Sequence, residues 1–306
     1  MTYFEFQEMF PSQEAAINYI LDKKYPNKQY VCPKCGCIHN IYHQRYDVRK
    51  FYCNNCKSEF SGLANTIFEN THLDLRMWLY AINLINVSRK GISALQLKRE
   101  LGMKSYNSAW RMMKQIRSAM GNDEMKEIFE AIVEIDETYV GGKPRKNNNH
   151  LDGDENNNKR GRGTAKTPVI GVKERNTGKV HAVVANKNAD GKQLTGKQLF
   201  NVLKKVCKDN TIVMTDQFKG YNILDKENCK NFIRLQIDHN VMYSMGNGIH
   251  TNGIESFWAL LKRGVYGIFH HVSTKYLQEY VNEFCFRLNY REEKIAFDKI
   301  ICLGIK

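Results

Sequence analysis

Cys32-Pro33-Lys34-Cys35 and Cys53-Asn54-Asn55-Cys56 are two Cys-x-x-Cys segments in the first part of the chain. Two such pairs at this separation can bind one Zn²⁺ tetrahedrally through all four thiolates. No coordination position would stay open, so the metal would be structural and would hold together a segment too short to build its own core. The sequence therefore predicts a zinc ribbon over residues 28–62.

Alternatives to this zinc site are four buried free thiols or a disulfide framework. Disulfides are not favoured, because the chain carries no secretory signal. Free thiols are not favoured either, because chance rarely produces two paired knuckles. Cys37 follows the first pair closely and is either an exchangeable fifth ligand or, as we favour, a spare thiol.

The charge of the chain is strongly basic. Its 306 residues, enough for two or three domains, include 46 Lys and Arg against 32 Asp and Glu, a formal net charge of +14. Such an excess indicates a polyanionic partner but also fits an ordinary solvated surface. Together with a zinc ribbon it favours double-stranded DNA. The apolar stretches are shorter than a membrane span, so we expect a cytoplasmic protein that associates with the nucleoid and with no membrane.

Residues 63–121, which follow the predicted ribbon, have the pattern of a helix-turn-helix module. A helical segment over residues 1–27 precedes the ribbon. Ser93 can cap a short helix, and Gly102 can supply the turn before a longer helix that starts near Tyr106. The longer helix presents basic residues at helical spacing, which could contact phosphates or base edges: Arg111, Lys114 and Arg117. A plain helical hairpin with a solvated basic face is the alternative.

From residue 122 to residue 306 the sequence predicts a mixed α/β domain. Short β-branched runs at 132–135, 168–172, 180–184, 211–214 and 232–237 alternate with helical segments at 191–208, 252–263 and 275–293. Between the first two runs lies a basic, nearly apolar-free loop over residues 143–166. We expect this loop to lie on DNA through Arg160 and Arg162.

Acidic residues mark the ends of two of these predicted strands. Asp136 ends the first, Asp216 follows the run that starts at Thr211, and Glu255 stands on the helix that begins near Thr251. Lys262 lies two turns after Glu255, where it can reach a phosphate. Clustered carboxylates repel one another unless cations bind them, and two Mg²⁺ ions about 4 Å apart support phosphoryl transfer. The sequence thus predicts a magnesium site made by these three acids.

Three sequence segments around these acids carry a family resemblance: residues 134–143, 215–221 and 250–264. With residues 270–273 and 284–289, they resemble signature segments of bacterial insertion-sequence transposases. That family joins an N-terminal zinc ribbon to a DDE-type (acidic-triad) catalytic domain of ribonuclease-H-like fold. The resemblance extends over residues from about 15 to 292.

The resemblance implies a DNA transposase that binds element ends and catalyses Mg²⁺-dependent cleavage and strand transfer, as a dimer or larger assembly on DNA. Asp136 and Asp216 would be metal ligands. The third ligand is Glu255 or, as in parts of the family, Asn252, and we favour Glu255 for its charge. Lys262 and Arg263 would contact DNA.

Other polar residues in these segments are expected to have roles outside the metal site. Glu134 and Glu137 match no ligand position, so a structural or solvated role is expected for both. His250 would contact phosphate or cap the helix. The rival function is a zinc-ribbon, helix-turn-helix regulator that binds DNA without cutting it; a nuclease without strand transfer is the third reading.

Overall fold

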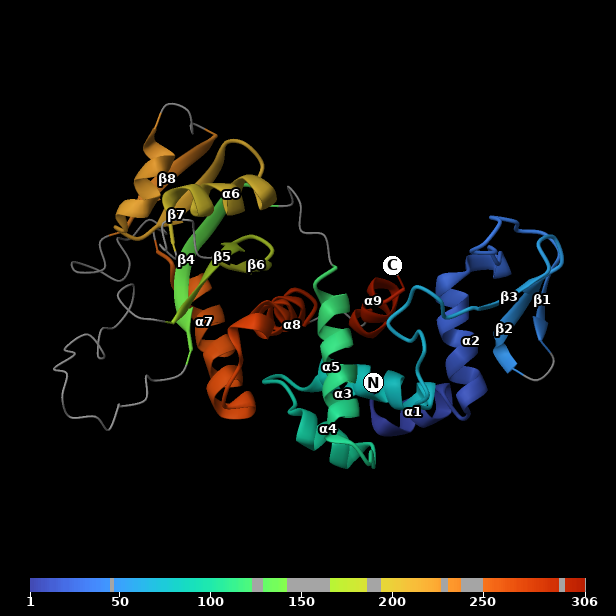
Figure 1. Ribbon diagram of the computed structural model, residues 1–306. Coiled ribbons are helices and arrows are strands. Elements are labelled where there is room, and N and C mark those ends of the chain that lie inside the picture. The colour runs from blue at the N-terminus through green and yellow to red at the C-terminus, as the bar shows by residue number, and fades with distance from the viewer. Residues whose placement is uncertain are drawn as a thin grey trace, which may run out of the picture. The chain divides into compact units, whose positions relative to one another are not determined.

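The computed structural model describes residues 1–44, 47–122, 129–141, 166–185, 194–226, 231–237, 250–291 and 295–305 (Figure 1). The chain forms two compact units. The first joins Met1–Asp123 to Tyr290–Lys306, and the second is Glu124–Asn289. Among the described residues, no helix is long and apolar enough to cross a membrane.

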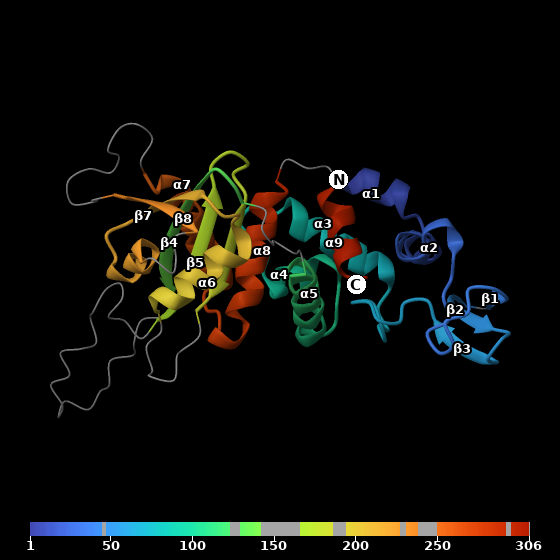
Figure 2. The ribbon, with the colours of Figure 1, turned by 90° about the horizontal axis from the view of Figure 1, so that it is seen from above.

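A three-stranded antiparallel sheet forms the ribbon of the first unit, in the order β1-β2-β3 (Figure 2). Its strands are β1 (Ile41–Gln44), β2 (Asp47–Cys53) and β3 (Ser58–Ser61). Phe51 is fully buried and stacks on its cross-strand partner Phe60, with ring centroids 5.5 Å apart. This small aromatic centre is the kind of limited core that needs a metal for stability.

Helices make up the rest of the first unit: α1 (Tyr3–Met9), α2 (Gln13–Lys24), the short η1 (Pro26–Lys28), α3 (Leu75–Val87), α4 (Ala94–Glu100), α5 (Tyr106–Met120) and α9 (Ala296–Leu303). Ser93 caps α4 as predicted, because its Oγ accepts the backbone N–H of Gln96 at 3.1 Å. Gly102 has a φ of +61° and makes the predicted turn before α5. Helices α4 and α5 pack together.

Helix α9 belongs to the first unit, although it comes last in the chain. Its Asp298 accepts hydrogen bonds from the Tyr19 hydroxyl and, at 2.6 Å, from Lys23 Nζ, both on α2. The buried residues Ile300 and Ile301 supply its apolar face. From the sequence alone, residues 290–306 were expected to belong to the catalytic domain. The structure places them with the N-terminal helices, because the apolar stripe of α9 finds its core there.

The second unit is built on a five-stranded mixed sheet in the order β6-β5-β4-β7-β8. The strands are β4 (Ile132–Val140), β5 (Thr167–Glu174), β6 (Val180–Val184), β7 (Thr211–Thr215) and β8 (Phe232–Gln236). Strand β5 is antiparallel to β4 and β6, whereas β7 and β8 run parallel to β4. All five predicted strands are present.

Helices cover both faces of this sheet. Helix α6 (Gly196–Val206) and η4 (Lys219–Asp225) share one apolar core with β4, β7 and β8. Helices α7 (Asn252–Gly264) and α8 (Leu277–Asn289) share a second core with the other face of β5 and β6. The π-helical turn η6 (Val265–Phe269) and the short η7 (Thr274–Tyr276) connect α7 to α8.

Strand β4 is longer than predicted. Asp136 lies in the middle of it, since antiparallel pairing with β5 continues up to the pair Val140–Thr167. Of the predicted basic loop, residues 143–165 lie outside the described residues, and Arg160 and Arg162 are therefore not placed.

Candidate functional site

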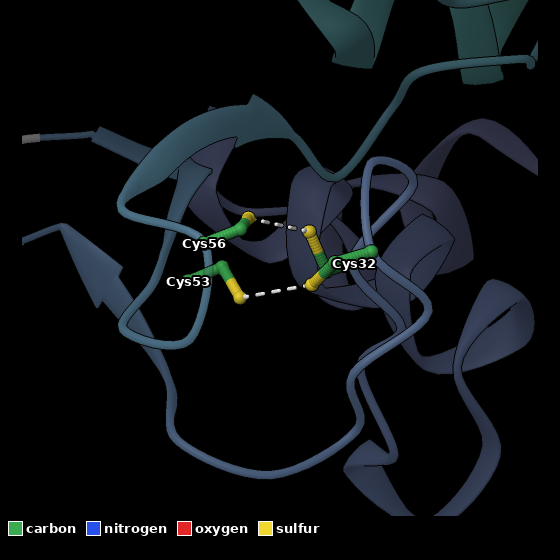
Figure 3. A group of neighbouring side chains, drawn as sticks. Cys32, Cys53 and Cys56 are labelled. Carbon is green, nitrogen blue, oxygen red and sulfur yellow. Dashed lines mark hydrogen bonds between the residues drawn. The ribbon is translucent and has the colours of Figure 1, made fainter.

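The four predicted zinc ligands come together at one end of the ribbon (Figure 3). Cys32 and Cys53 are buried, with Cys35 exposed and Cys56 between these extremes. Cys32 Sγ lies 3.6 Å from Cys56 Sγ, and Cys35 Sγ lies 3.7 Å from Cys53 Sγ. The sequence folds this way locally because Gly36, with φ +69°, turns the first knuckle and donates its N–H to the Cys32 carbonyl at 2.9 Å.

These distances fit a tetrahedral metal site. Zinc–sulfur bonds of about 2.3 Å place the sulfurs of a tetrahedron roughly 3.8 Å apart. The four ligand atoms all lie within 4.8 Å of one another, and Cys37 is not among them. The Cys37 thiol instead donates to the His39 carbonyl at 2.9 Å. The donor set therefore fits a structural Zn²⁺, with Cys37 as a spare thiol.

A cluster of carboxylates lies on the second unit where β4 and β7 meet. The parallel ladder between these strands ends at the pair Glu134–Met214. Two residues further along each strand, the same register places Asp136 beside Asp216. Strand β7 ends at Thr215, so Asp216 directly follows its last residue. Their carboxylate oxygens and one of Glu137 lie within 4.8 Å of one another.

The electrostatics of this cluster favour cation binding. Burial, together with the nearby charges of Glu137 and Asp216, raises the pKa of Asp136 to about 7. Asp216 Oδ1 accepts the backbone N–H of Phe218 at 2.9 Å, which orients the carboxylate. Hard divalent ions prefer such oxygen ligands. The residues present thus fit Mg²⁺.

Helix α7 carries the other predicted catalytic residues, Asn252, Glu255 and Lys262, and the predicted DNA-binding residue Arg263, and all four are exposed. Glu255 accepts a hydrogen bond from the Thr251 hydroxyl at 3.1 Å and is not part of the carboxylate cluster. It lies three residues before Trp258, whose indole Nε1 donates to Asp136 Oδ2 at 3.0 Å. Because residues three apart are neighbours on a helix, Glu255 stands one turn from the residue that touches the cluster.

Glu134 joins the start of α7 to β4. Its side chain is 2% exposed, and the carboxylate accepts the backbone N–H of Ile254 at 2.9 Å. Arg175 Nε lies 2.8 Å from the same carboxylate, and His250 Nδ1 lies 3.3 Å from it. Arg175 also donates to the His250 carbonyl. Glu134 thus has the structural role that the sequence predicted, and the His250 side chain faces Arg175 and Glu134 rather than capping the helix.

The basic residues of α5 differ in their exposure. Arg111 is exposed, and Lys114 is half-buried with its Nζ 5.9 Å from the Trp110 ring centroid. Arg117 is buried, with 2% of its surface exposed. The sequence placed all three cations on one solvated face, and for Arg117 the structure differs. The reason is that Arg117 lies four residues after Met113 and three before Met120, both buried, so helical periodicity places it on the core side of α5.

Three residues near the carboxylates were missed or undervalued in the sequence. Glu137 belongs to the cluster, although it was expected to be structural or solvated. Trp258 is a buried core residue of α7, yet its indole also touches Asp136. Tyr221 donates its hydroxyl to Glu137 Oε2 at 2.9 Å. The sequence signal that could have identified Tyr221 is its place in the segment 215–221, which carries the family resemblance, and not a hydrophobic periodicity.

Comparisons with known proteins agree with this organisation. Residues 128–289 match the ISXO2-like transposase domain, and residues 11–59 match the transposase zinc-ribbon domain. A Halobacterium salinarum protein, named as an uncharacterized protein in the transposable element ISH50, is 28% identical over 259 residues, covering 83% of each chain.

Two solved structures have low overall similarity, at which the likeness supports no inference. One is the simian T-cell lymphotropic virus intasome in complex with PP2A regulatory subunit B56 gamma, with a TM-score of 0.31, 11% identity and 66% of each chain covered. The other is the Mos1 strand transfer complex, with a TM-score of 0.23, 12% identity, and coverage of 72% of this chain and 77% of that chain.

The two family matches follow each other in the chain as the ribbon and the α/β unit do. The transposase-domain match alone covers more than half of the sequence. It contains both strand acids, Asp136 and Asp216, and the whole of α7. The chain belongs to the insertion-sequence transposases with an ISXO2-like transposase domain and a transposase zinc ribbon.

Proposed function

We propose that the chain is a DDE-type DNA transposase that cuts the ends of its insertion sequence and joins them to target DNA in a Mg²⁺-dependent reaction. The observation that carries the proposal is the position of Asp136 beside Asp216 at the point where β7 ends. We assign the catalytic domain to the ribonuclease-H-like class. Support comes from the mixed five-stranded sheet, covered by helices on both faces, with acids on its central strand and the neighbouring strand.

Each residue of the cluster has a defined task in this proposal. Asp136 and Asp216 supply carboxylate oxygens to the metal, and the Phe218 N–H keeps the Asp216 carboxylate oriented. Two Mg²⁺ ions held there would activate the attacking oxygen and stabilise the leaving oxygen of the scissile phosphodiester. Lys262, exposed on the last turn of α7, is proposed to contact a DNA phosphate.

The third ligand is proposed to come from α7. Glu255 is favoured over Asn252, because an ionised carboxylate neutralises Mg²⁺ better than an amide. Its position one turn from Trp258 supports a short movement of the side chain toward Asp136. Glu137, already in the cluster, is the competing candidate.

We propose that the first unit and helix α7 of the second unit each contact DNA. The net charge of +14 favours a polyanion. Arg111 and Lys114 on α5 are proposed to contact the element end, as the longer helix of a helix-turn-helix module does. Arg263 would add a contact near the catalytic cluster. Because an element has two ends, we propose a dimer or larger assembly on DNA, in the cytoplasm at the nucleoid.

The test is nicking and joining of a labelled DNA fragment that carries the element end, with Mg²⁺ or Mn²⁺. Asp136→Asn and Asp216→Asn keep the side-chain shape but remove the charge that holds the cation. Each should lower cleavage by several orders of magnitude and leave end binding intact. Asp209→Asn is the matched control. Asp209 lies just before β7 and accepts a hydrogen bond from Asn231, and neither residue belongs to the carboxylate cluster.

Two outcomes contradict the proposal. Wild-type protein that binds the end specifically yet never cuts it with either metal would be a DNA-binding regulator. Cleavage that survives both Asp→Asn changes would place the metal site elsewhere. Nicking without joining would support the cluster but identify a nuclease.

A further inference from the structure

The neighbouring acids Asp136 and Glu137 are each held by an aromatic hydrogen-bond donor, from opposite faces of the sheet. Successive residues of a strand point to opposite faces. Asp136 meets Trp258 on the face covered by α7, and Glu137 meets Tyr221 on the face covered by η4. The two donors therefore reach one cluster from two separate cores.

Trp258 is placed with little freedom to move. Trp258 is 4% exposed, and its ring centroid lies 5.1 Å from that of Phe257. Nε1 can only donate, so the contact to Asp136 Oδ2 at 3.0 Å has an unambiguous direction. A carboxylate offers about four lone-pair sites, and this bond uses one of them. Asp136 can thus be oriented by the indole and still bind a metal.

A glycine makes the room for this contact. Gly171 is the cross-strand partner of Asp136 on β5. A Cβ added there would lie 2.5 Å from Trp258 Cη2 and 2.9 Å from Ile254 Cδ1. Any side chain at this position would displace the indole. The absence of a side chain opposite Asp136 is therefore a condition for the hydrogen bond.

Tyr221 is placed equally firmly on the other face. It is fully buried within the core shared by α6, η4 and β4. The Phe218 ring packs edge-on against it, with centroids 5.8 Å apart. Its hydroxyl donates to Glu137 Oε2 at 2.9 Å. The short segment from Asp216 through Phe218 to Tyr221 connects the acid that follows β7 with the tyrosine that donates to Glu137.

We propose that Trp258 and Tyr221 are positioning residues for the metal ligands, and that Glu137, held by Tyr221, contributes to the same metal site. The inference rests on the proposed function, because it assigns roles around the proposed Mg²⁺ site. Hydrogen-bond donors behind metal-binding carboxylates fix their orientation, and their removal typically lowers metal affinity about 10- to 100-fold. Neither aromatic residue touches DNA or metal in this assignment.

The experiment measures Mn²⁺ binding to the full chain without DNA, by the loss of the free Mn²⁺ signal in electron paramagnetic resonance. Trp258→Phe and Tyr221→Phe each remove one donor and keep an aromatic ring in the core. Each should weaken Mn²⁺ binding at least about tenfold. Glu137→Gln should weaken it further than Tyr221→Phe, and Gly171→Ala should reproduce Trp258→Phe by displacing the indole.

Matched controls come from the first unit. Trp78 is 3% exposed and donates Nε1 to Thr71 Oγ1 at 2.9 Å, and Tyr19 donates its hydroxyl to Asp298. Trp78→Phe and Tyr19→Phe remove the same chemical groups far along the chain from the cluster. They should shift thermal unfolding and leave Mn²⁺ binding unchanged. Replacement of Trp258 by benzothienylalanine, which keeps the ring shape without an N–H, serves if Trp258→Phe unfolds the unit.

The outcomes separate this inference from the proposed function. Wild-type protein whose Mn²⁺ binding is abolished by Asp216→Asn, but unchanged in the Trp258 and Tyr221 variants, would overturn the inference alone. Wild-type protein that binds no Mn²⁺ would overturn both. Weakened binding in both aromatic variants, with control values unchanged, would support positioning from both faces.

Discussion

Ile254 donates its backbone N–H to Glu134 Oε2 at 2.9 Å, which joins the first turn of α7 to the beginning of β4. Gly253 makes this approach possible, because a Cβ there would lie 2.7 Å from the same oxygen. The Glu134 side chain is 2% exposed and also pairs with Arg175. The helix that bears Glu255 and Trp258 is thus attached to the strand that bears Asp136 through a buried carboxylate, in addition to the Trp258–Asp136 hydrogen bond.

Glu134→Ala should destabilise the second unit. It leaves Arg175, whose side chain is 18% exposed, without its buried partner and removes the acceptor of the Ile254 N–H. Removal of one partner of a buried pair costs roughly 3–5 kcal/mol. Urea unfolding at constant protein concentration measures the change. Glu130→Gln is the control, because the Glu130–Lys208 pair is exposed and its loss should not be measurable. Equal stability of the two variants would contradict the assigned role.

The zinc ribbon should depend on its metal. Cys53→Ser removes one of four ligands and should release zinc and unfold residues 28–62, with the second unit still folded around its own core. Metal analysis by mass spectrometry and the near-ultraviolet circular dichroism of the aromatic ribbon core measure the two effects. Cys37→Ser is the control, and it should retain one zinc per chain because its thiol lies outside the group of four. Wild-type protein purified without chelators and free of zinc would contradict the site.

Arg111 and Lys114 should contribute to end binding through phosphate contacts. Their joint replacement by Ala should weaken binding and lower the slope of log K against log salt by about 0.9 for each lost contact. Arg117 is left in place because it is buried. The control is Lys204→Ala with Lys205→Ala, two exposed cations at the end of α6, which changes the net charge equally. An unchanged slope in the Arg111–Lys114 variant, measured by fluorescence anisotropy, would exclude α5 as the DNA-binding helix.

The sequence predicted those parts of the structure that are decided by residues close to one another in the chain. Ligand spacing in the two cysteine knuckles and β-branched runs in the strands are local, so the ribbon and all five strands of the second unit were predictable. The length of β4 was not, because residues beyond Asp136 are held by pairing with β5, which is decided by tertiary contacts. The burial of Arg117 and the attachment of α9 to the first unit have the same origin.

The site shows the same division. The strand positions of Asp136 and Asp216 predicted that they would meet, since parallel strands keep a common register. Glu137 points to the opposite face from Asp136 in a regular strand, so periodicity argued against its presence in the cluster. Its carboxylate nevertheless lies in the cluster and accepts a hydrogen bond from the Tyr221 hydroxyl. Such a placement needs the three-dimensional arrangement of strands.

The stability of the metal-free protein should fall as the pH rises through the range set by Asp136. Its pKa is raised from 3.8 to about 7 in the folded state, first by burial and then by the charges of Glu137 and Asp216. Between about pH 4 and pH 7 the folded state therefore binds more protons than the unfolded state, and its free energy of unfolding decreases with pH. Asp136→Asn removes this dependence and should unfold at a higher temperature than wild type at pH 8 in magnesium-free buffer. Calorimetry at pH 5 and pH 8 measures the stability of both proteins. A wild-type protein that is more stable at pH 8 than at pH 5, by a difference that Asp136→Asn removes, would contradict the prediction.

The third metal ligand should be identified by three substitutions compared in one assay. Glu255→Gln, Glu137→Gln and Asn252→Ala each remove one candidate, and the true ligand should lower Mg²⁺-dependent cleavage as far as Asp216→Asn does. We expect this of Glu255, because its charge suits Mg²⁺ and α7 holds it one turn from the indole that touches Asp136. Glu137→Gln should mainly raise the Mg²⁺ concentration that gives half-maximal cleavage, because the proposed site retains its other acids. Ser256→Ala is the control on the same helix turn, where the hydroxyl bonds only the Gly253 carbonyl among its described contacts. If Glu255→Gln cuts at the wild-type rate while Asn252→Ala or Glu137→Gln is inactive, the third ligand is the residue whose loss abolishes cleavage, and the assignment of Glu255 to the metal site is wrong.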